Sequence, residues 1–318
     1  MPSFLQARFG SIIGDCALMH DIYRKVSKAA AFRAPILVTG EHGTGKELVA
    51  REVHQRSNHH KGPFVTVNCG SIPENLMESE LFGHVRGAFT GALFTRGGKF
   101  QSAHQGTLFI DEIADIPLSV QAKLLTAISD KAVIKVGDTR TEAVDVRLIV
   151  ATTRNLALVV RSGLFREDLY YALTTFPMNL PPLRDRGNDV ILIANFLLQK
   201  QAHLAKKHFI GLTESAQNAL INYSWSGNIR ELENVVSRAA MLAQGDRIDV
   251  GDLSINAATD EAIVPLSEAV ERFRHAYIHN SLERNAGNRT RAAKELGIDP
   301  RTIFRHLEQQ KRAETPAT

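Results

Sequence analysis

Residues 40–47 read Gly40-Glu41-His42-Gly43-Thr44-Gly45-Lys46-Glu47 and lie between an apolar run, 36–39, and a helical pattern, 47–54. Glycines at a strand-to-helix turn let backbone N–H groups surround a phosphate, and the Lys46 ammonium would face the anion. The spacing is GxxxxGK, with Glu47 where Ser or Thr usually binds magnesium. The stretch therefore predicts a phosphate-binding loop that departs from the common pattern at one position.

A second apolar run, 107–110, ends in two adjacent carboxylates, Asp111 and Glu112. In a doubly wound sheet the strands end at the phosphate side. Asp111 would orient a magnesium ion that bridges the terminal phosphates, and Glu112 would act as a base or position the attacking water. An Asp-Glu pair is usually a plain surface turn, but the apolar strand before it and the loop upstream favour the catalytic interpretation.

Strand-length apolar runs at 36–39, 64–67, 107–110 and 147–151 alternate with helical patterns. This alternation predicts an α/β fold with a doubly wound parallel sheet flanked by helices. After Pro181-Pro182 the strands are expected to stop, and helices are expected at 190–207, 213–223 and 228–243. The predicted organisation is a sheet domain over 1–180, a helical appendage over 181–250, a linker over 251–265 and a small all-α domain over 266–318.

Composition narrows the class of protein. The chain has 318 residues, of which 44% are hydrophobic, enough for one large and one small packed domain. No stretch approaches the ~18 apolar residues of a membrane span, and residues 1–10 lack a secretion signal, so we expect a cytoplasmic protein with no membrane partner. Cys16 and Cys69 have no second ligand nearby and are interpreted as reduced thiols. A metal is therefore expected only together with nucleotide.

Between the two phosphate-site motifs lies the loop Gly87-Ala88-Phe89-Thr90-Gly91-Ala92. Glycines at both ends permit a mobile hairpin tip, while Phe89 and Thr90 offer an apolar and a hydroxyl contact surface. Composition alone leaves a second interpretation open, a turn with Phe89 tucked into the core.

The C-terminal segment is a candidate nucleic-acid surface, because +3 of the net charge of +4 falls within residues 265–318. Residues 288–307 predict two short helices around Gly297, and Asp299 and Pro300 suit the start of the second. The predicted core residues are Ala293, Leu296, Ile298, Ile303 and Leu307. The residues expected to reach a major groove are Arg291, Arg301, Thr302, Arg305 and His306. A solvated helical face or a three-helix protein-interaction module is the alternative.

With these stretches together, the sequence resembles the AAA+ domain of the sigma-54-dependent transcription activators, the bacterial enhancer-binding proteins, followed by a Fis-type helix-turn-helix. Glu47 belongs to that family's own variant of the phosphate loop. The resemblance covers nearly the whole sequence. The other matching stretches are 79–84, 87–92, 106–113, 165–171, 180–184 and 227–232.

The resemblance implies an AAA+ P-loop domain with a helical lid, which binds ATP and Mg²⁺ and assembles into a hexameric ring. It implies that residues 87–92 touch sigma-54 and follow the state of the nucleotide. The implied catalytic residues are Lys46, Asp111, Glu112, Arg166 and Asn68, with Asp111 on the metal. The implied nucleotide-binding residues are Gly40, Glu41, His42, Gly43, Thr44, Gly45, Lys46, Glu47, Thr152 and Arg230.

Several roles follow from the resemblance alone. Asn68 would hold Glu112 away from water until the partner is engaged, and Arg230 would sense the γ-phosphate. Arg166 matches one of two arginines that reach into the neighbouring subunit's site, where a guanidinium neutralises transition-state charge. Thr152 and Thr153 occupy the strand-end sensor, where relatives usually have Thr-Asn.

The most consequential departure from the family pattern is Ala172, where relatives generally have the second arginine. Loss of such an arginine is worth roughly 10³ to 10⁵ in rate in comparable enzymes. Smaller departures are Val85-Arg86 in place of Glu-Lys, and Gln101 in place of Glu.

The sequence therefore predicts an ATP-dependent activator that binds upstream double-stranded DNA and remodels sigma-54 RNA polymerase through residues 87–92. The alternative is a nucleotide- and DNA-binding regulatory subunit with impaired hydrolysis that joins a mixed ring with a paralogue. An AAA+ chaperone or replication loader would not account for the contact loop. The family's usual N-terminal receiver or sensory domain is not in the sequence, so control is expected from a separate partner protein, unless the sequence is a truncated piece.

Overall fold

The computed structural model describes residues 8–205, 207–243 and 245–255, together with residues 274, 277–278, 281–282, 285, 288–299 and 303. The chain forms two compact units, Met1–Ala257 and Ala258–Thr318. Within the described residues, no helix has the length and the apolar character needed to cross a membrane.

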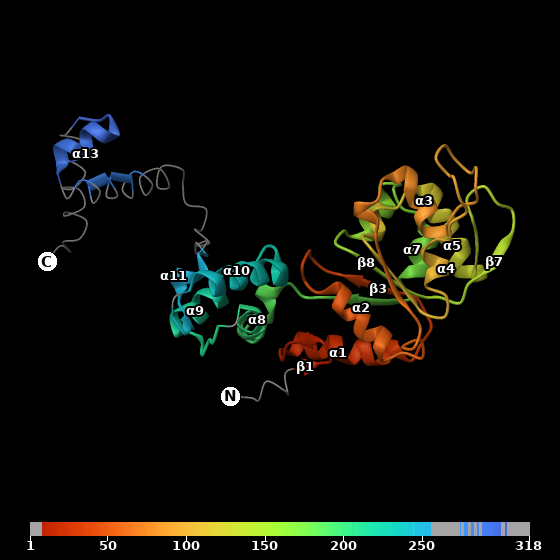
Figure 1. Cartoon of the computed structure of the whole chain (residues 1–318), viewed down its shortest axis with the longest axis horizontal. Coiled ribbons are helices and arrows are strands. Elements are labelled where there is room, and N and C mark those ends of the chain that lie inside the picture. The colour runs from red at the N-terminus through yellow and green to blue at the C-terminus, as the bar shows by residue number, and fades with distance from the viewer. Residues whose placement is uncertain are drawn as a thin grey trace. The chain divides into compact units, whose positions relative to one another are not determined.

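The first unit contains a five-stranded parallel sheet with the order β4-β5-β8-β3-β9 (Figure 1). Its strands are β3 (Ile36–Thr39), β4 (Phe64–Asn68), β5 (Thr107–Asp111), β8 (Arg147–Thr152) and β9 (Phe176–Asn179). The apolar runs predict four of these but not β9, because Pro177 interrupts it. β9 pairs with β3 alone, and an edge position tolerates a residue that has no N–H to donate.

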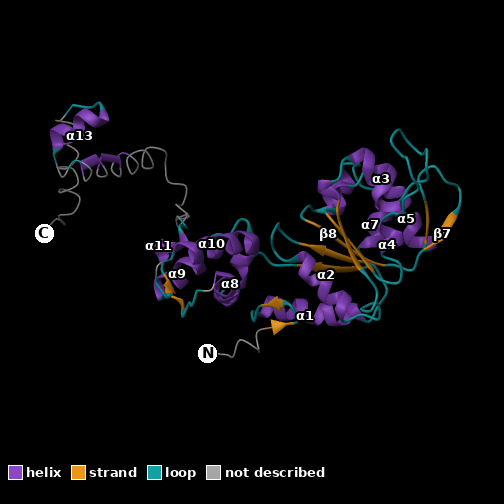
Figure 2. Cartoon of the chain, viewed as in Figure 1, coloured by secondary structure: helices purple, strands orange, loops and turns teal. Residues whose placement is uncertain are grey.

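Helices cover both faces of the sheet, with the strands between them (Figure 2). Ile36, Val38 and Phe109 point to the face that α1 and α2 cover, whereas Leu37 and Leu108 point to the opposite face. The predicted doubly wound sheet is thus confirmed. The helices are α1 (Ala17–Ala30), α2 (Lys46–Gln55), α3 (Glu74–Phe82), α4 (Lys99–Ser102), α5 (Leu118–Asp130), α6 (Leu156–Arg161) and α7 (Glu167–Leu173), with the 3-10 helices η1 (Cys69–Ser71) and η2 (Ile113–Asp115).

Two short antiparallel pairs accompany the main sheet. β1 (Arg8–Phe9) pairs with β2 (Ile12–Ile13), and β6 (Ala132–Ile134) pairs with β7 (Thr141–Ala143). The second pair follows α5 and carries the loop of residues 135–140 at its tip.

A helical lid completes the first unit and has its own core around the buried Trp225. Its elements are η3 (Leu183–Arg186), α8 (Asp189–Ala205), α9 (Glu214–Asn222), α10 (Asn228–Leu242) and α11 (Val250–Leu253). Two expectations need correction here. Strands do occur after residue 182, since β10 (Gly211–Leu212) pairs with β11 (Arg247–Ile248), but two residues are too few for a periodic signal. The expected linker also starts too early, because Leu253 is fully buried in the lid core.

The second unit contains α13 (Arg289–Leu296), which ends at Gly297 with a positive φ of 65°. Ile278, Ala292, Ala293 and Ile303 form its buried cluster, with Leu296 and Ile298 packed against it. The described part of the predicted small helical core is therefore present. Pro300 and Leu307, which the sequence assigns to the second helix, lie outside the described residues.

Candidate functional site

The predicted phosphate-binding loop joins β3 to α2, as expected for a strand-to-helix turn. Gly40, Gly43 and Gly45 have positive φ angles of 152°, 75° and 100°, a region that favours glycine. The buried Lys46 ammonium donates to the carbonyl oxygens of Gly40 and Glu41, at 3.0 and 3.1 Å. Burial lowers the pKa of Lys46, which means that it disfavours the charged ammonium. An anion bound in the loop would act in the opposite direction and stabilise the charged form.

Two carboxylates lie beside this lysine. Asp111 is the last residue of β5 and Glu112 follows it, so both emerge at the sheet edge that carries the loop. Burial raises the pKa of Asp111, the charge of Glu112 raises it further, and the charge of Lys46 opposes both effects. The structure therefore brings Lys46, Asp111 and Glu112 together at one edge of the sheet, where the sequence predicts them.

Glu112 is held by Thr153. The Glu112 backbone is left-handed, with φ 52° and ψ 53°, a strained conformation that its surroundings must hold. Its Oε2 accepts hydrogen bonds from the backbone N–H and the hydroxyl of Thr153, both at 3.1 Å. The neighbouring Thr152 is buried, and its hydroxyl accepts from the N–H of Arg154 at 3.0 Å. Thr153 thus orients the Glu112 carboxylate, a contact that the sequence did not reveal.

Asn68 lies close to this carboxylate without bonding to it. It ends β4 opposite Asp111 in the sheet register. A Cβ at Gly70 would lie 3.4 Å from the Asn68 Oδ1 and 3.9 Å from the Glu112 Cβ, so both side chains face the same small space. The hydrogen bonds that the Glu112 carboxylate accepts come from Thr153. The switch role of Asn68 stays a prediction.

The lid is tied to the phosphate-binding loop through Glu41. Arg184 donates to the two carboxylate oxygens of Glu41 at 2.8 and 2.6 Å, and the amide of Asn228 donates to Oε2 at 3.1 Å. The fully buried Asn228 also donates to the His42 carbonyl at 2.9 Å, and the N–H of Ile229 donates to the Gly43 carbonyl at 3.0 Å. The start of α10 therefore lies directly on the loop.

An N-terminal segment that was not predicted to belong to the site is also tied to the lid. The Asp189 carboxylate, at the start of α8, accepts from the N–H groups of Asp15 and Cys16 at 2.8 and 3.2 Å. The buried Arg186 donates to the carbonyl of Thr44 in the phosphate-binding loop at 2.8 Å. Residues before α1, the phosphate-binding loop and the lid are thus joined by polar contacts.

The Glu41 link predicts a pH dependence of stability. Hydrogen bonds from Arg184, and then from Asn228, lower the pKa of Glu41 to about 2, against 4.5 for a free side chain. Because this pKa is lower in the folded state, the ionised Glu41 carboxylate adds to the free energy of unfolding above about pH 4.5. This stabilisation is lost as the pH falls toward about 2. We expect Glu41→Gln to lower the free energy of unfolding at pH 7, and the difference from wild type to shrink by pH 3, in urea denaturation.

The matched control is Glu47→Gln. Glu47 lies in the first turn of α2, and its carboxylate pairs with Arg51 one turn further along that helix. Such exposed pairs contribute little, so this variant should stay close to wild type. A Glu41→Gln difference that is the same at pH 7 and pH 3 would contradict the assignment.

The two predicted arginines of the site lie differently. The backbone of Arg230 approaches Gly43, and its charge acts on the Lys46 pKa, so Arg230 is at the site. Arg166 is the N-cap residue before α7, is exposed, and donates to both carboxylate oxygens of Asp168 at 3.0 and 2.7 Å. Its role in a neighbouring subunit stays a prediction. Ala172 lies half-buried on the same helix.

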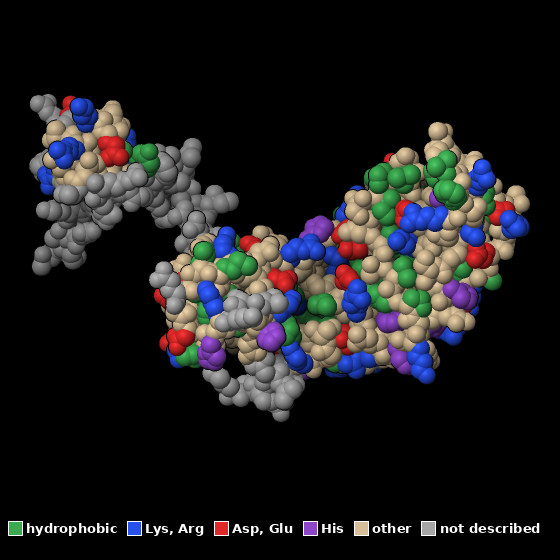
Figure 3. Space-filling view, viewed as in Figure 1, with side chains coloured by type: hydrophobic (Ala, Val, Ile, Leu, Met, Phe, Trp, Pro, Cys, Tyr) green, Lys and Arg blue, Asp and Glu red, His purple; other side chains and the backbone are tan. Residues whose placement is uncertain are grey.

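The loop of residues 87–92 is a closed turn with an exposed tip. The N–H of Gly87 donates to the Ala92 carbonyl at 2.9 Å. Phe89 is 38% exposed and makes an edge-to-face contact with His84 at 5.0 Å, so the interpretation that places it in the core is wrong. Leu93 and Phe94 follow at 70% and 78% exposure. Hydrophobic side chains gather on the part of the first unit's surface that carries α3 (Figure 3).

The base of this loop is fixed to the loop of residues 135–140. The N–H of Val85 donates to the Val136 carbonyl at 3.1 Å, and the N–H of Val136 donates to the Gly83 carbonyl at 2.9 Å. A Cβ at Gly137 would lie only 2.8 Å from that of Ala88, so the two loops touch. The base of the loop of residues 87–92 is therefore attached to the loop of residues 135–140, while its tip is exposed.

One residue of the predicted DNA-binding face, Arg291, lies within the described part of the chain. Arg291 is exposed on α13, whose N-terminus is capped by the Asn288 side chain. Arg301, Thr302, Arg305 and His306 lie outside the described residues.

Comparisons with known proteins agree with this geometry. Residues 12–179 match the sigma-54 interaction domain family, residues 184–265 the AAA+ ATPase lid domain, and residues 269–309 the Fis family of bacterial regulatory proteins. The regulatory protein AtoC of Escherichia coli (strain K12) is 42% identical over 313 residues, covering 95% of this chain and 68% of AtoC. The transcriptional regulatory protein ZraR of Klebsiella oxytoca is 44% identical over 310 residues, covering 95% and 69%. The structure of NtrX from Brucella abortus in complex with ATP has a TM-score of 0.72 at 34% identity, covering 96% and 71%.

Proposed function

We propose that this chain, which belongs to the sigma-54 interaction domain family and carries an AAA+ lid and a Fis-type domain, activates transcription by remodelling sigma-54 RNA polymerase with ATP. One observation carries the proposal. Lys46, Asp111 and Glu112 meet at one edge of the sheet, in the same unit as a loop that exposes Phe89 between two glycines.

The site residues suit hydrolysis of a nucleoside triphosphate. The loop of residues 40–47 and the Lys46 ammonium would hold the phosphates. Asp111 fits Mg²⁺, because such sites commonly use one or two carboxylates together with substrate phosphates. Burial raises the pKa of Asp111 and so disfavours its charged form, which a bound cation would stabilise. The metal would neutralise charge that develops on the phosphates. Glu112, oriented by Thr153, would accept a proton from the attacking water.

The proposed partners lie at three other surfaces. Residues 87–92 would contact sigma-54, and their attachment to the loop of residues 135–140 gives the sheet domain a route to move them. Arg166, exposed at the start of α7, would complete the site of the next protomer in a hexameric ring, since head-to-tail contacts close into rings. The Fis-type domain would bind upstream double-stranded DNA through Arg291, Arg301, Thr302, Arg305 and His306. The proposed setting is the cytoplasm.

One observation favours a second candidate function. Ala172 cannot donate a charge-assisted hydrogen bond, so the chain could act as a nucleotide- and DNA-binding subunit that needs a hydrolysing paralogue in a mixed ring. The first candidate, an activator that hydrolyses ATP itself, is favoured because the other proposed catalytic groups are present: Lys46, Asp111, Glu112 and Arg166.

The proposal predicts that Thr90→Ala separates hydrolysis from partner capture. Thr90 is exposed at the loop tip and lies outside the phosphate site, so ATP binding should match wild type. Capture of purified sigma-54 in the presence of an ATP transition-state analogue should fall at least tenfold, because the hydroxyl is at the proposed contact surface. Pull-down with the analogue, with ADP and without nucleotide measures this.

Thr126→Ala is the matched control, because Thr126 lies on α5 and its hydroxyl donates to the Ala122 carbonyl of the same helix. It should capture sigma-54 like wild type. Equal capture by Thr90→Ala, or capture that ignores the nucleotide, would mean that the loop has another task.

A further inference from the structure

The first residues of α10 lie close against the phosphate-binding loop. The Asn228 side-chain amide donates to the His42 carbonyl at 2.9 Å, and the Ile229 N–H donates to the Gly43 carbonyl at 3.0 Å. A Cβ at Gly43 would lie 2.3 Å from the carbonyl oxygen of Gly227, so the approach leaves no room for a side chain there. The lid therefore binds two neighbouring peptide groups of the loop.

Arg186, in η3 of the lid, binds the next peptide group. Its side chain is buried, and its guanidinium donates to the Thr44 carbonyl at 2.8 Å. The same guanidinium donates from two of its nitrogens to the Pro181 carbonyl, at 3.1 and 2.8 Å. These hydrogen bonds end on backbone oxygens, so the buried cation is fixed between the loop and the segment that leads into the lid.

The three contacts fix the direction of three N–H groups. In a trans peptide the C=O of one residue and the N–H of the next point in opposite directions, and no described residue has a cis peptide bond. Because the lid holds the carbonyls of residues 42, 43 and 44, the N–H groups of Gly43, Thr44 and Gly45 point away from the lid donors. Among the backbone hydrogen bonds of the described residues, these three N–H groups are not donors. Successive N–H groups of this kind form a concavity that suits an anion.

We propose that Arg186 and Asn228 are positioning residues for phosphate, which hold the loop carbonyls and so direct the loop N–H groups toward the bound anion. This role rests on the proposed function, because it takes residues 40–47 as the phosphate-binding loop. Donors that are already oriented reduce the ordering cost of binding. The contacts also couple the lid to the ligand. A lid that moves off the loop releases the three carbonyls, so the form with the lid on the loop binds phosphate more tightly.

Binding of pyrophosphate to the full chain tests this role. Sodium pyrophosphate is titrated in the presence of EDTA, so that calorimetry measures the loop without a metal ion. Arg186→Gln removes the guanidinium that holds Thr44 and should weaken binding by about tenfold or more. Asn228→Gly changes no charge, and glycine accepts the positive φ of 53° at this position. It should weaken binding by about three- to tenfold, because the His42 carbonyl loses its donor.

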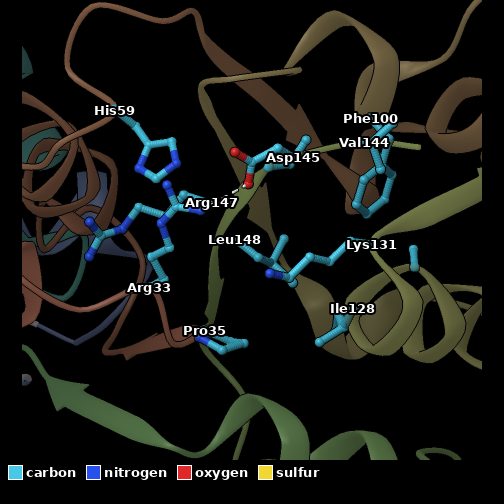
Figure 4. Close-up of a pocket in the computed structure, with 12 residues that line it drawn as sticks. Arg33, Pro35, His59, Phe100, Ile128, Lys131, Val144, Asp145, Arg147 and Leu148 are labelled. Carbon is cyan, nitrogen blue, oxygen red and sulfur yellow. Dashed lines mark hydrogen bonds and ion pairs between the residues drawn. The ribbon is translucent and has the colours of Figure 1, made fainter.

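Arg33→Gln is the charge-matched control for Arg186→Gln. Arg33 lies before β3, at the sheet edge where the strands begin, and there it lines a separate cavity and pairs with Asp145 at 3.4 Å (Figure 4). This variant should bind pyrophosphate like wild type. Urea unfolding with and without pyrophosphate separates binding from structure. A merely structural role would lower the free energy of unfolding without ligand, but it would leave the increase that the ligand gives unchanged.

Two results would contradict the role of Arg186 and Asn228, and they differ in what they leave standing. If wild type binds pyrophosphate and both folded variants bind it within about twofold of wild type, the positioning role is wrong and the phosphate-binding loop remains. If wild type binds neither pyrophosphate nor ATP, the proposed function fails, and the positioning role fails with it. Should Arg186→Gln not fold, the affinity of Asn228→Gly decides between these results.

Discussion

Ala172→Arg is expected to raise phosphate release by roughly 10³- to 10⁵-fold, if the second arginine of the family pattern is what this site lacks. A guanidinium supplied by the neighbouring protomer stabilises charge on the transferring phosphoryl group. Ala172 is half-buried on α7, so an arginine can lay its stem along the helix surface while its head reaches outward. Steady-state phosphate release by the purified chain, without any paralogue, is the measurement.

Two comparisons make this result specific. Leu158→Arg places the same charge on the exposed face of the neighbouring α6 and should leave the rate unchanged. The rate per subunit of Ala172→Arg should also rise with protein concentration, because the arginine acts on another protomer. If wild type already releases phosphate faster than Lys46→Ala, and Ala172→Arg does not raise the rate further, then Ala172 does not limit hydrolysis. The mixed-ring alternative then loses its support.

The sequence was sufficient for those parts of the fold that depend on neighbouring residues. The phosphate-binding loop, the strand before it and the acidic end of β5 each depend on a short pattern, and each lies where the pattern predicts. β9 was missed because Pro177 is unusual in a strand and is tolerated at the sheet edge. β10 and β11, of two residues each, carry no period at all.

The contacts that assemble the site could not be predicted, because they join distant segments. Glu41 meets Asn228 across 187 residues, and Asp189 meets Asp15 across 174 residues. Asn228 has a positive φ of 53°, a conformation that Asn tolerates better than most residues, so the Gly-Asn pair at the start of α10 was an available signal. Nothing local marked Arg184 as the partner of Glu41.

Thr153 shows how a departure from a family pattern becomes interpretable in the structure. From the sequence, Thr in place of Asn only shortens the inventory of donors. In the structure, the hydroxyl and the N–H of this one residue both reach the same oxygen of Glu112, so the shorter side chain still holds the carboxylate. Gln101, which stands where relatives have Glu, makes two hydrogen bonds in the structure. Its side-chain oxygen accepts from the N–H of Gly98 at 2.8 Å, and its amide nitrogen donates to the Phe82 carbonyl at 3.0 Å. An ionised Glu could accept the first hydrogen bond but could not donate the second.

Glu112→Gln should abolish turnover while leaving ATP binding intact, with phosphate release lower by about 10²- to 10⁴-fold, the usual contribution of a general base. The substitution removes the basic oxygen but keeps an amide oxygen that can accept both hydrogen bonds from Thr153. The left-handed backbone at this position should therefore be retained. The measurement is made in the Ala172→Arg background, so that a low wild-type rate does not hide the effect, with nucleotide affinity measured in parallel.

Asp115→Asn is the matched control for Glu112→Gln, because Asp115 follows three residues later and pairs with Arg154 at 3.4 Å on the exposed side. It should keep both binding and turnover. If Glu112→Gln turns over within tenfold of its parent, proton transfer to this carboxylate does not limit the reaction. The two hydrogen bonds from Thr153 would then serve only to hold the strained turn after β5, and water would have to be activated by another group at this edge of the sheet.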